Sequence, residues 1–307
     1  MKAGFVSFLG RPNAGKSTLL NRIVGHKLAI VSDKPQTTRT RIVGVKNYVG
    51  GPDEARPANE GQVVFVDTPG VHKPTHRMNK RMVDVALEAM REVDVLCLVV
   101  DVAVKPGPGD RYLLTLLKDV KTPAILALNK VDRIAKPKLL PIIDHYQHQH
   151  PFVEIVPISA TDGTNVDVLE KLFLQHLPEG EPLYPADYVT DQPERFFIGE
   201  IVREQVLQLT HDELPFSTAV IVDRIEPADD RITNIYCTIL VDRESQKPIV
   251  IGRAGAMIKQ IGTAARAELE RYLESRVFLD LHVKVKSEWR DDERVLDELG
   301  VDRARRT

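Results

Sequence analysis

The sequence predicts an α/β fold with a doubly wound, mostly parallel sheet, followed by a smaller α+β domain. With 307 residues, the chain exceeds the size at which one hydrophobic core usually stops growing, so two domains are expected. Up to about residue 177, short β-rich runs alternate with longer segments of helical periodicity. A stretch rich in proline and acidic residues follows. We therefore expect domains over residues 1–182 and 196–307, joined by a flexible linker over 183–195.

The first domain is expected to contain six strands and five helices. The apolar, β-branched runs lie at residues 5–10, 41–48, 62–68, 95–102, 124–130 and 154–159. Several of them are almost continuously apolar, which is typical of strands that helices cover on both faces. Helical spacing of apolar residues is found at 16–24, 79–93, 110–118, 138–148 and 165–176. The Gly- and Pro-rich stretch 50–61 between two strands predicts an exposed loop.

Composition excludes several classes of protein. Hydrophobic residues make up 43% of the chain and charged residues 28%, so neither a disordered nor a membrane-embedded protein is expected. The longest apolar stretch, 93–104, contains two aspartates and is shorter than the roughly 20 residues of a membrane span. Cys97 and Cys237 lie in apolar runs and are expected to be reduced core thiols. We expect a cytoplasmic monomer, and the sequence leaves peripheral membrane contact open.

The strongest motif, GRPNAGKS, lies at residues 10–17 between the first expected strand and the first helix. Its glycines allow the backbone to wrap around phosphate oxygens and to point N–H groups at them. Lys16 is expected to reach the terminal phosphates, and Ser17 to place its hydroxyl on Mg²⁺. The residues expected at the phosphates are Gly10, Arg11, Pro12, Asn13, Ala14, Gly15, Lys16, Ser17 and Thr18. This motif predicts a nucleoside triphosphate site.

Three further motifs follow later strands in the same domain. In DTPG, the carboxylate of Asp67 can hold Mg²⁺ and the Gly70 N–H can approach the γ-phosphate, although an Asp that caps a turn explains this motif equally well when it stands alone. In NKVD, the Asp132 carboxylate can accept two hydrogen bonds from guanine that adenine cannot offer. The residues expected around the nucleotide are Asp67, Thr68, Pro69, Gly70, Asn129, Lys130, Asp132, Ser159, Ala160 and Thr161. Because these motifs follow successive strands, they predict one site at the carboxyl edge of the sheet.

The third motif is SAT at residues 159–161, and further residues of NKVD (129–132) and SAT have expected tasks. Lys130 would lay its aliphatic stem along the purine, while Asn129 would tie its loop to the phosphate loop. The backbone N–H of Ala160 could donate to guanine O6. With these residues, the segment from Met1 to His176 resembles the Ras-like GTPase superfamily. The resemblance implies bound GTP or GDP with Mg²⁺.

The same resemblance implies two nucleotide-sensitive switch loops, at residues 34–41 and 71–80. Either Thr37 or Thr38 is expected to ligate Mg²⁺, with Thr38 preferred, so the expected metal-binding set is Ser17, Thr38 and Asp67. Arg39 and Arg41 could act as arginine fingers, but solvated charges in the switch loop are the favoured interpretation.

Hydrolysis requires its own explanation, because Val71 stands where many relatives have a glutamine that orients the attacking water. GTPases with an apolar residue there resemble this chain in having an Asn in the phosphate loop, here Asn13, which can coordinate K⁺ in that group. A K⁺ ion at Asn13 is therefore a hypothesis, and slow intrinsic turnover is expected. The residues expected to act in hydrolysis are Asn13, Lys16, Thr38 and Gly70.

The second domain is expected to begin with an amphipathic helix, 195–209, and to continue with strands, a short helix near Ser245, a long helix that ends at Leu273, a strand and a charged tail. A GxxG loop, Gly252–Gly255, stands between apolar residues at helical spacing and resembles the loop of KH modules. In such modules the glycines admit phosphates, and apolar residues floor a groove for about four nucleotides. The residues expected to bind RNA are Ile251, Gly252, Arg253, Ala254, Gly255, Ile258 and Lys259. A plain Gly-rich turn is the alternative.

A single GTPase domain joined to such a segment resembles the Era family of bacterial GTPases over nearly the whole chain. The strings that carry the resemblance are KPQTTR at 34–39, THDELPFS at 210–217, IGRAGAMIK at 251–259 and VKVKSEWRDD at 283–292. Phe216 and the pair Arg253-Ala254 depart from the residues expected there. The resemblance implies a type II-like KH domain that binds near the 3′ end of small-subunit ribosomal RNA and acts in maturation of the 30S subunit.

Two rival functions remain at this point. A tRNA-modification GTPase would share the phosphate-loop asparagine, but that family ends in a catalytic cysteine, whereas Cys237 is the last cysteine here. An RNA-binding scaffold could instead use bound nucleotide only to set its orientation, without significant hydrolysis. A net charge of −2 decides nothing, but nine basic and five acidic residues lie between Lys247 and Arg290, so basic charge is concentrated around the expected groove.

Overall fold

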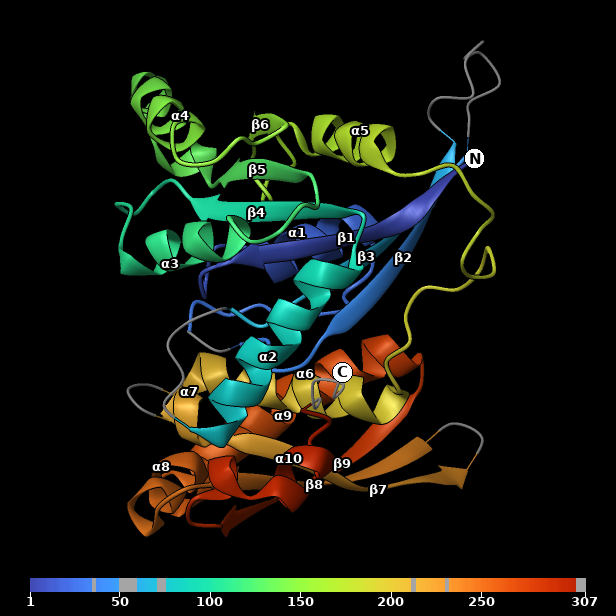
Figure 1. Cartoon of the computed structure of the whole chain (residues 1–307). Helices are drawn as coiled ribbons and strands as arrows, with labels where there is room; N and C mark the ends of the chain where they lie inside the picture. Colours follow the sequence, from blue (N-terminus) through green and yellow to red (C-terminus); the bar gives the residue numbers. More distant parts are fainter. Residues whose placement is uncertain (35–36, 50–59, 71–75, 211–213, 230–231, 302–307) are drawn as a thin grey trace.

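The computed structural model describes residues 1–34, 37–49, 60–70, 76–210, 214–229 and 232–301. Two domains are stacked on one another, and the switch regions of the first face the second (Figure 1). Most of the expected 50–61 loop, Val71 and half of the second switch lie outside the described residues, as do residues 35–36 of the first switch.

The first domain is a six-stranded sheet with the strand order β2-β3-β1-β4-β5-β6. Strand β2 runs antiparallel to β3, and all other neighbours are parallel. The strands are β1 Lys2–Gly10, β2 Ile42–Tyr48, β3 Gly61–Asp67, β4 Val95–Asp101, β5 Ala124–Asn129 and β6 Glu154–Pro157. The helices are α1 Lys16–Val24, α2 Arg77–Glu92, α3 Pro108–Leu117, α4 Leu139–Gln147 and α5 Val166–His176. The expected doubly wound fold is confirmed.

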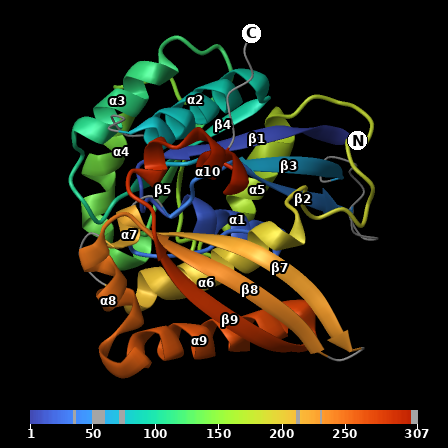
Figure 2. The ribbon, with the colours of Figure 1, turned by 90° about the horizontal axis from the view of Figure 1, so that it is seen from below.

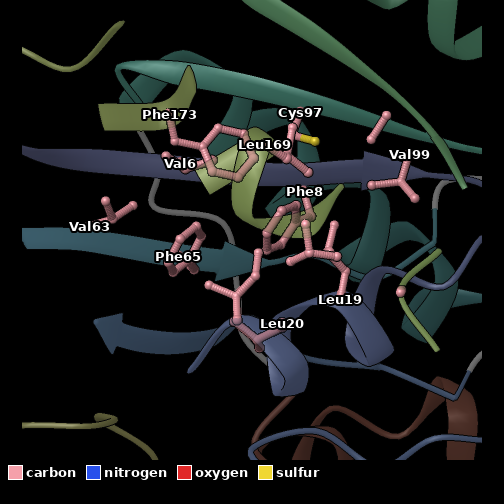
Figure 3. Packing of buried hydrophobic residues seen from close by; sticks show 14 of the residues in the cluster. Val6, Phe8, Leu19, Leu20, Val63, Phe65, Cys97, Val99, Leu169 and Phe173 are labelled. Atoms are coloured by element: carbon pink, nitrogen blue, oxygen red, sulfur yellow. The ribbon is translucent and has the colours of Figure 1, made fainter. Parts of the chain in front are cut away.

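Helices cover both faces of this sheet, which explains its continuously apolar strands. Helices α1 and α5 pack on one face, while α2, α3 and α4 pack on the other. Figure 3 shows the first of these cores, where Phe8 stacks on Phe65 at 5.6 Å between ring centroids and Phe173 meets both rings edge-on. Cys97 lies in the same core, and burial raises the pKa of its thiol. Cys237 is also a buried free thiol, as expected.

The second domain is a three-stranded sheet of order β7-β8-β9, in which β8 pairs antiparallel with β7 and parallel with β9. Its elements are α6 Glu194–Leu209, α7 Leu214–Ser217, β7 Ala219–Asp229, β8 Ile232–Val241, α8 Lys247–Ile251, α9 Ala256–Leu273, β9 Arg276–Val285 and α10 Glu293–Glu298. Helices α6 and α9 pack on one face of the sheet through an apolar core of their own. Since α8 is helical, the short helix expected near Ser245 is confirmed, apart from a 3₁₀ turn at its start.

Two expectations about the regions between the domains are wrong. Helix α6 is not amphipathic at the surface but is buried on most sides, because it lies between the two domains. The linker is not loose: it lies along the edge strand β2, where Val45 N donates to Val189 O at 2.8 Å and Thr190 Oγ1 donates to Val43 O at 2.6 Å. The linker thus satisfies backbone groups of an edge strand, a task that its composition does not reveal.

The segment expected to be a charged tail is rich in charged residues, but residues 286–301 also fold back onto the protein. Trp289 is fully buried between Met78 and Met82 of α2 and Ala219 and Leu240 of the second sheet. Its indole N–H donates to Ser217 O at 2.9 Å. In the part of the chain that the structure describes, no helix is long and apolar enough to cross a membrane.

Candidate functional site

The phosphate loop leaves β1 and enters α1 through Gly15, whose φ of +94° belongs to the left-handed region. A Cβ atom there would lie 2.2 Å from the side-chain nitrogen of Asn129, so only glycine fits. The Lys16 ammonium lies inside the loop, 3.2 Å from the carbonyl oxygens of Gly10 and Arg11. Burial lowers the pKa of Lys16, and the nearby Asp67 carboxylate partly offsets this. The loop therefore holds a poorly solvated cation that an anionic ligand would stabilise.

The three expected metal ligands lie together. Ser17 Oγ is 2.7 Å from Asp67 Oδ2 and 2.8 Å from Thr38 Oγ1. Thr37 Oγ1 instead donates to Lys34 O at 2.6 Å, so the geometry favours Thr38. Burial raises the pKa of Asp67, whose Oδ1 has no hydrogen-bond partner among the described residues. Hard oxygen donors with an unsatisfied carboxylate oxygen fit Mg²⁺.

The base-recognition loops are tied to the phosphate loop by side-chain hydrogen bonds. Asn129 donates to Ala14 O at 2.8 Å and accepts from Ala160 N at 2.9 Å, so its amide joins three loops. Lys130 donates to Asn13 O at 2.7 Å and pairs with Asp101 Oδ2 at 2.5 Å. These bonds hold the loops in a fixed relation before any ligand binds.

A cavity of about 560 Å³ lies between these loops. Of the expected residues, it is lined by Pro12, Asn13, Gly15, Lys16, Ser17, Thr18, Thr38, Gly70, Asn129, Lys130, Ala160 and Thr161. The remaining expected residues, which lie in the same loops outside this lining, are Gly10, Arg11, Ala14, Asp67, Thr68, Pro69, Asp132 and Ser159. Thr68 is buried and donates to Phe8 O at 2.7 Å, which gives it a structural task. Arg11 points to α3, where it pairs with Asp110 at 2.9 Å.

Sequence reasoning missed several residues of this cavity. They are Ile30, Val31, Ser32, Asp33, Asp101, Val104 and Arg133. Asp101 ends β4 at the same sheet edge as the expected motifs, so its position was a usable signal, whereas residues 30–33 follow no recognisable pattern. Asn13 donates to Asp33 O at 2.5 Å, and its proposed K⁺ role stays a prediction.

The GxxG loop joins α8 to α9. Gly252 has a φ of +76°, and a Cβ there would lie 2.6 Å from the backbone nitrogen of Met257, so a side chain cannot be accommodated. Arg253 and Ala254 between the glycines are exposed. Ile251, Gly255 and Ile258 are partly buried around the loop, and Lys259 is exposed on α9. The loop thus presents bare backbone and one cation to solvent.

A groove of about 570 Å³ runs from this loop between α9 and β9. Ile258 and Lys259 line its helical side, together with Gly262, Thr263, Arg266 and Glu270. Its strand side is formed by residues that sequence reasoning missed: Arg276, Val277, Phe278, Leu279 and Leu281. The available signal was the alternation of Val and Leu with other, mostly polar residues along 276–285. The groove is apolar at its floor and carries three cations, as single-stranded nucleic acid requires.

Helix α6 of the second domain binds the first switch directly. Arg203, which is 2% exposed, forms an ion pair with Glu200 at 2.6 Å and donates to Thr37 O. Glu204 accepts from Val31 N at 2.8 Å and pairs with Lys27. Thr37 directly precedes Thr38, the candidate metal ligand. Helix α6 therefore contacts the first switch one residue before the nucleotide site.

The C-terminal segment binds both switches. Arg39 is buried rather than solvated: it donates to Thr218 O at 2.8 Å, and its guanidinium lies 5.4 Å from the Trp289 ring centroid. In the second switch, Arg77 N donates to Asp291 Oδ1 at 2.8 Å, and one turn further along α2 Arg81 pairs with Asp297 at 2.8 Å and donates to Val301 O at 2.9 Å. The interpretation of Arg39 as a solvated charge is therefore wrong, because the second domain covers it.

Known proteins resemble both parts of the chain. Residues 5–130 match a family model described as a 50S ribosome-binding GTPase, and residues 213–290 match the model of the KH domain. The GTPase Era of Geobacter metallireducens is 49% identical over 300 residues, which cover 97% of each chain. The GTPase Era of Geobacter sp. strain M21 is 48% identical over 301 residues, which cover 98% of each chain.

Solved structures agree with this over the full length. Aquifex aeolicus Era bound to GDP and AlF₄⁻ superposes with a TM-score of 0.91, and Era in complex with MgGDPNP and nucleotides 1506–1542 of 16S ribosomal RNA superposes with 0.92. Each is 42% identical, and each comparison covers 98% of this chain and 99% of the other. The chain therefore belongs to the Era family of GTPases.

Proposed function

We propose that this GTPase uses its nucleotide state to control how its KH groove holds single-stranded RNA near the 3′ end of small-subunit ribosomal RNA, during maturation of the 30S subunit. The observation that carries the proposal is the contact of both switches with the second domain, through Arg203 on Thr37 in the first switch and Asp291 on Arg77 in the second. A conformational change in either switch must then alter its contacts with the domain that carries the groove. The solved relative that holds 16S ribosomal RNA supports the choice of RNA.

The nucleotide site assigns a task to each part of the chain. Lys16 and the phosphate-loop N–H groups would hold the phosphates, and Gly70 N–H lies at the cavity where the γ-phosphate would sit. Ser17, Thr38 and Asp67 would hold Mg²⁺, which when bound neutralises charge that develops on the transferring phosphoryl group. Asp132 would recognise the guanine edge, while Asn129 fixes the loop that carries it.

Hydrolysis by this chain requires a way to position water without a glutamine after the DTPG motif. Asn13 lies at the cavity, and its side chain donates to Asp33 O, one residue before the first switch. A K⁺ ion held by its carbonyl oxygen would add positive charge between the phosphates, where an arginine finger acts in other GTPases. Neither Arg39 nor its neighbours would need to move into the site.

Membership of the Era family decides between the rival functions. The full-length relatives are Era GTPases, which argues against a tRNA-modification GTPase and against a scaffold that does not hydrolyse GTP. A monomer in the cytoplasm remains our expectation for the working form, and peripheral contact with a membrane surface stays a prediction that only a binding assay with vesicles can test.

The RNA arm of the proposal is tested by Gly252→Asp. A side chain would collide with Met257, and the carboxylate would repel phosphates, so affinity for single-stranded RNA is expected to fall about 10-fold or more. GTP affinity should stay the same. Gly180→Asp is the matched control, because it adds the same charge where a Cβ meets nothing within 4 Å. Equal RNA binding by both variants, or loss of GTP and RNA binding together, would contradict the proposal.

A further inference from the structure

The sheet of the KH domain has an outer face that lies mostly outside the groove, and its two halves differ. Residues Ile235, Cys237 and Ile239 of β8 point to the core under α6 and α9, so their neighbours Asn234, Tyr236 and Thr238 point outward. At one end of this outer face, Ala219 and Leu240 are covered by Trp289. The other end, drawn towards the viewer in Figure 2, is covered by none of the described segments.

Two aromatic rings lie side by side on the uncovered half. Phe278 of β9 is 52% exposed, and its ring lies 6.2 Å from that of Tyr236 in an edge-on arrangement. Arg224 of β7 is paired across the sheet with Tyr236, and its guanidinium lies 4.3 Å from the centroid of that ring. The rings of Phe278 and Tyr236 and the guanidinium of Arg224 thus form one row across β9, β8 and β7.

This row is continuous with the groove. Phe278 lines the groove on its strand side, at the end where the Val277 N–H donates to Glu270 of α9. Figure 2 shows α9 beside the edge strand β9, with the outer face of the sheet directly beyond it. A strand of RNA that leaves the groove over β9 therefore meets Phe278 first and Tyr236 next. Arg276 and Lys284 lie on the same side of β9 as Phe278, with Asp280 and His282 between Phe278 and Lys284, and the two cations can accompany the phosphates.

We propose that nucleotides beyond the four held in the groove stack on Phe278, Tyr236 and the Arg224 guanidinium, so that the outer sheet face is a second RNA-binding surface. Base stacking on aromatic rings tolerates any base, and a guanidinium plane offers a further stacking surface. With this surface, the domain binds a longer segment of RNA but gains little discrimination between sequences. This inference rests on the proposed RNA function and extends it.

The test uses the full chain and single-stranded RNA from the 3′ end of small-subunit ribosomal RNA. Affinities are measured for the best-binding four-nucleotide segment and for the same segment extended by three nucleotides at each end. Tyr236→Ala is expected to weaken the extended RNA about fivefold or more and to change the four-nucleotide affinity less than twofold. Tyr236→Phe, which keeps the ring, should behave as the parent protein. Tyr112→Ala, an exposed tyrosine on α3, is the control for loss of a surface aromatic.

Abasic nucleotides outside the four-nucleotide core give a second readout. They should weaken the extended RNA as Tyr236→Ala does, and the two changes together should cost no more than either alone. The inference is overturned if Tyr236→Ala and Phe278→Ala leave the affinity of the extended RNA unchanged while Gly252→Asp lowers it. It is also overturned if these variants weaken both lengths equally. If Gly252→Asp has no effect either, the RNA function itself fails.

Discussion

The nucleotide site and the RNA groove are built in opposite ways. In the nucleotide site, side chains from distant loops are bound to one another, as Asn129 is to Ala14 and Ala160, and the key carboxylate Asp67 is fully buried. In the groove and its GxxG loop, Lys259 and Arg253 are exposed, and recognition depends on bare backbone at Gly252. A preformed, enclosed site suits one ligand of fixed shape, whereas an open groove suits a polymer whose ends run on.

The largest expected effect is the loss of selectivity for guanine over adenine in the enclosed site when Asp132 is replaced. Asp132→Asn replaces a two-fold acceptor with an amide whose NH₂ group opposes the donors of guanine. GTP affinity is expected to fall about 100-fold or more, while RNA binding in the open groove stays unchanged. Titration with GTP and ATP measures this, and Asp119→Asn, on the exposed surface after α3, is the control. If parent protein and variant prefer GTP over ATP equally, Asp132 does not read the base.

The cation hypothesis concerns chemistry inside the enclosed site. If a K⁺ ion at Asn13 replaces the missing glutamine or arginine, GTP turnover is expected to be about 10-fold or more faster in KCl than in NaCl. Asn13→Ala should abolish that difference without preventing GTP binding. Steady-state phosphate release at equal ionic strength provides the measurement. Equal rates in both salts, unaffected by Asn13→Ala, would exclude the cation.

A smaller effect is expected where the two regions meet. Arg203→Ala removes the bond from α6 to Thr37 O and leaves Glu200 without its ion pair. The ratio of RNA affinities in the GTP-analogue and GDP states is then expected to shrink about fivefold. Arg195→Ala is the matched control, because Arg195 lies on the same helix but donates to Val222 O within the second domain. Should both variants keep the parent ratio, α6 does not carry the coupling.

The sequence predicted the enclosed site better than the contacts between domains. Phosphate-loop, DTPG, NKVD and SAT residues share one sheet edge because parallel strands place their carboxyl ends together, so order along the chain was enough. The choice of Thr38 over Thr37 agrees with the hydroxyl contact to Ser17. The bounds of the two domains remain a prediction. The contacts of individual residues with nucleotide, Mg²⁺ and RNA remain predictions as well.

What the sequence did not predict depends on long-range packing. Arg39 and Arg203 read as solvated or amphipathic positions, but both are buried at a contact between segments about 160 residues or more apart. Trp289 stands in a charged run and becomes the centre of an apolar cluster only when α2 and the second sheet approach it. The groove residues on β9 were missed because the only motif, the GxxG loop, precedes α9 on the other side of the groove. Local patterns cannot indicate which distant surface will cover a residue.

The most direct test compares RNA affinity with GDP bound and with a non-hydrolysable GTP analogue bound, in the same protein and the same salt. Because Arg203 contacts the first switch and Asp291 contacts the second, the two affinities should differ about fivefold or more, and RNA should change the relative affinity for the two nucleotides by the same factor. Trp289 is the sole tryptophan and contacts Arg39, so its emission should shift between the two states. Identical RNA affinities and identical emission in both states would contradict the link between nucleotide and RNA.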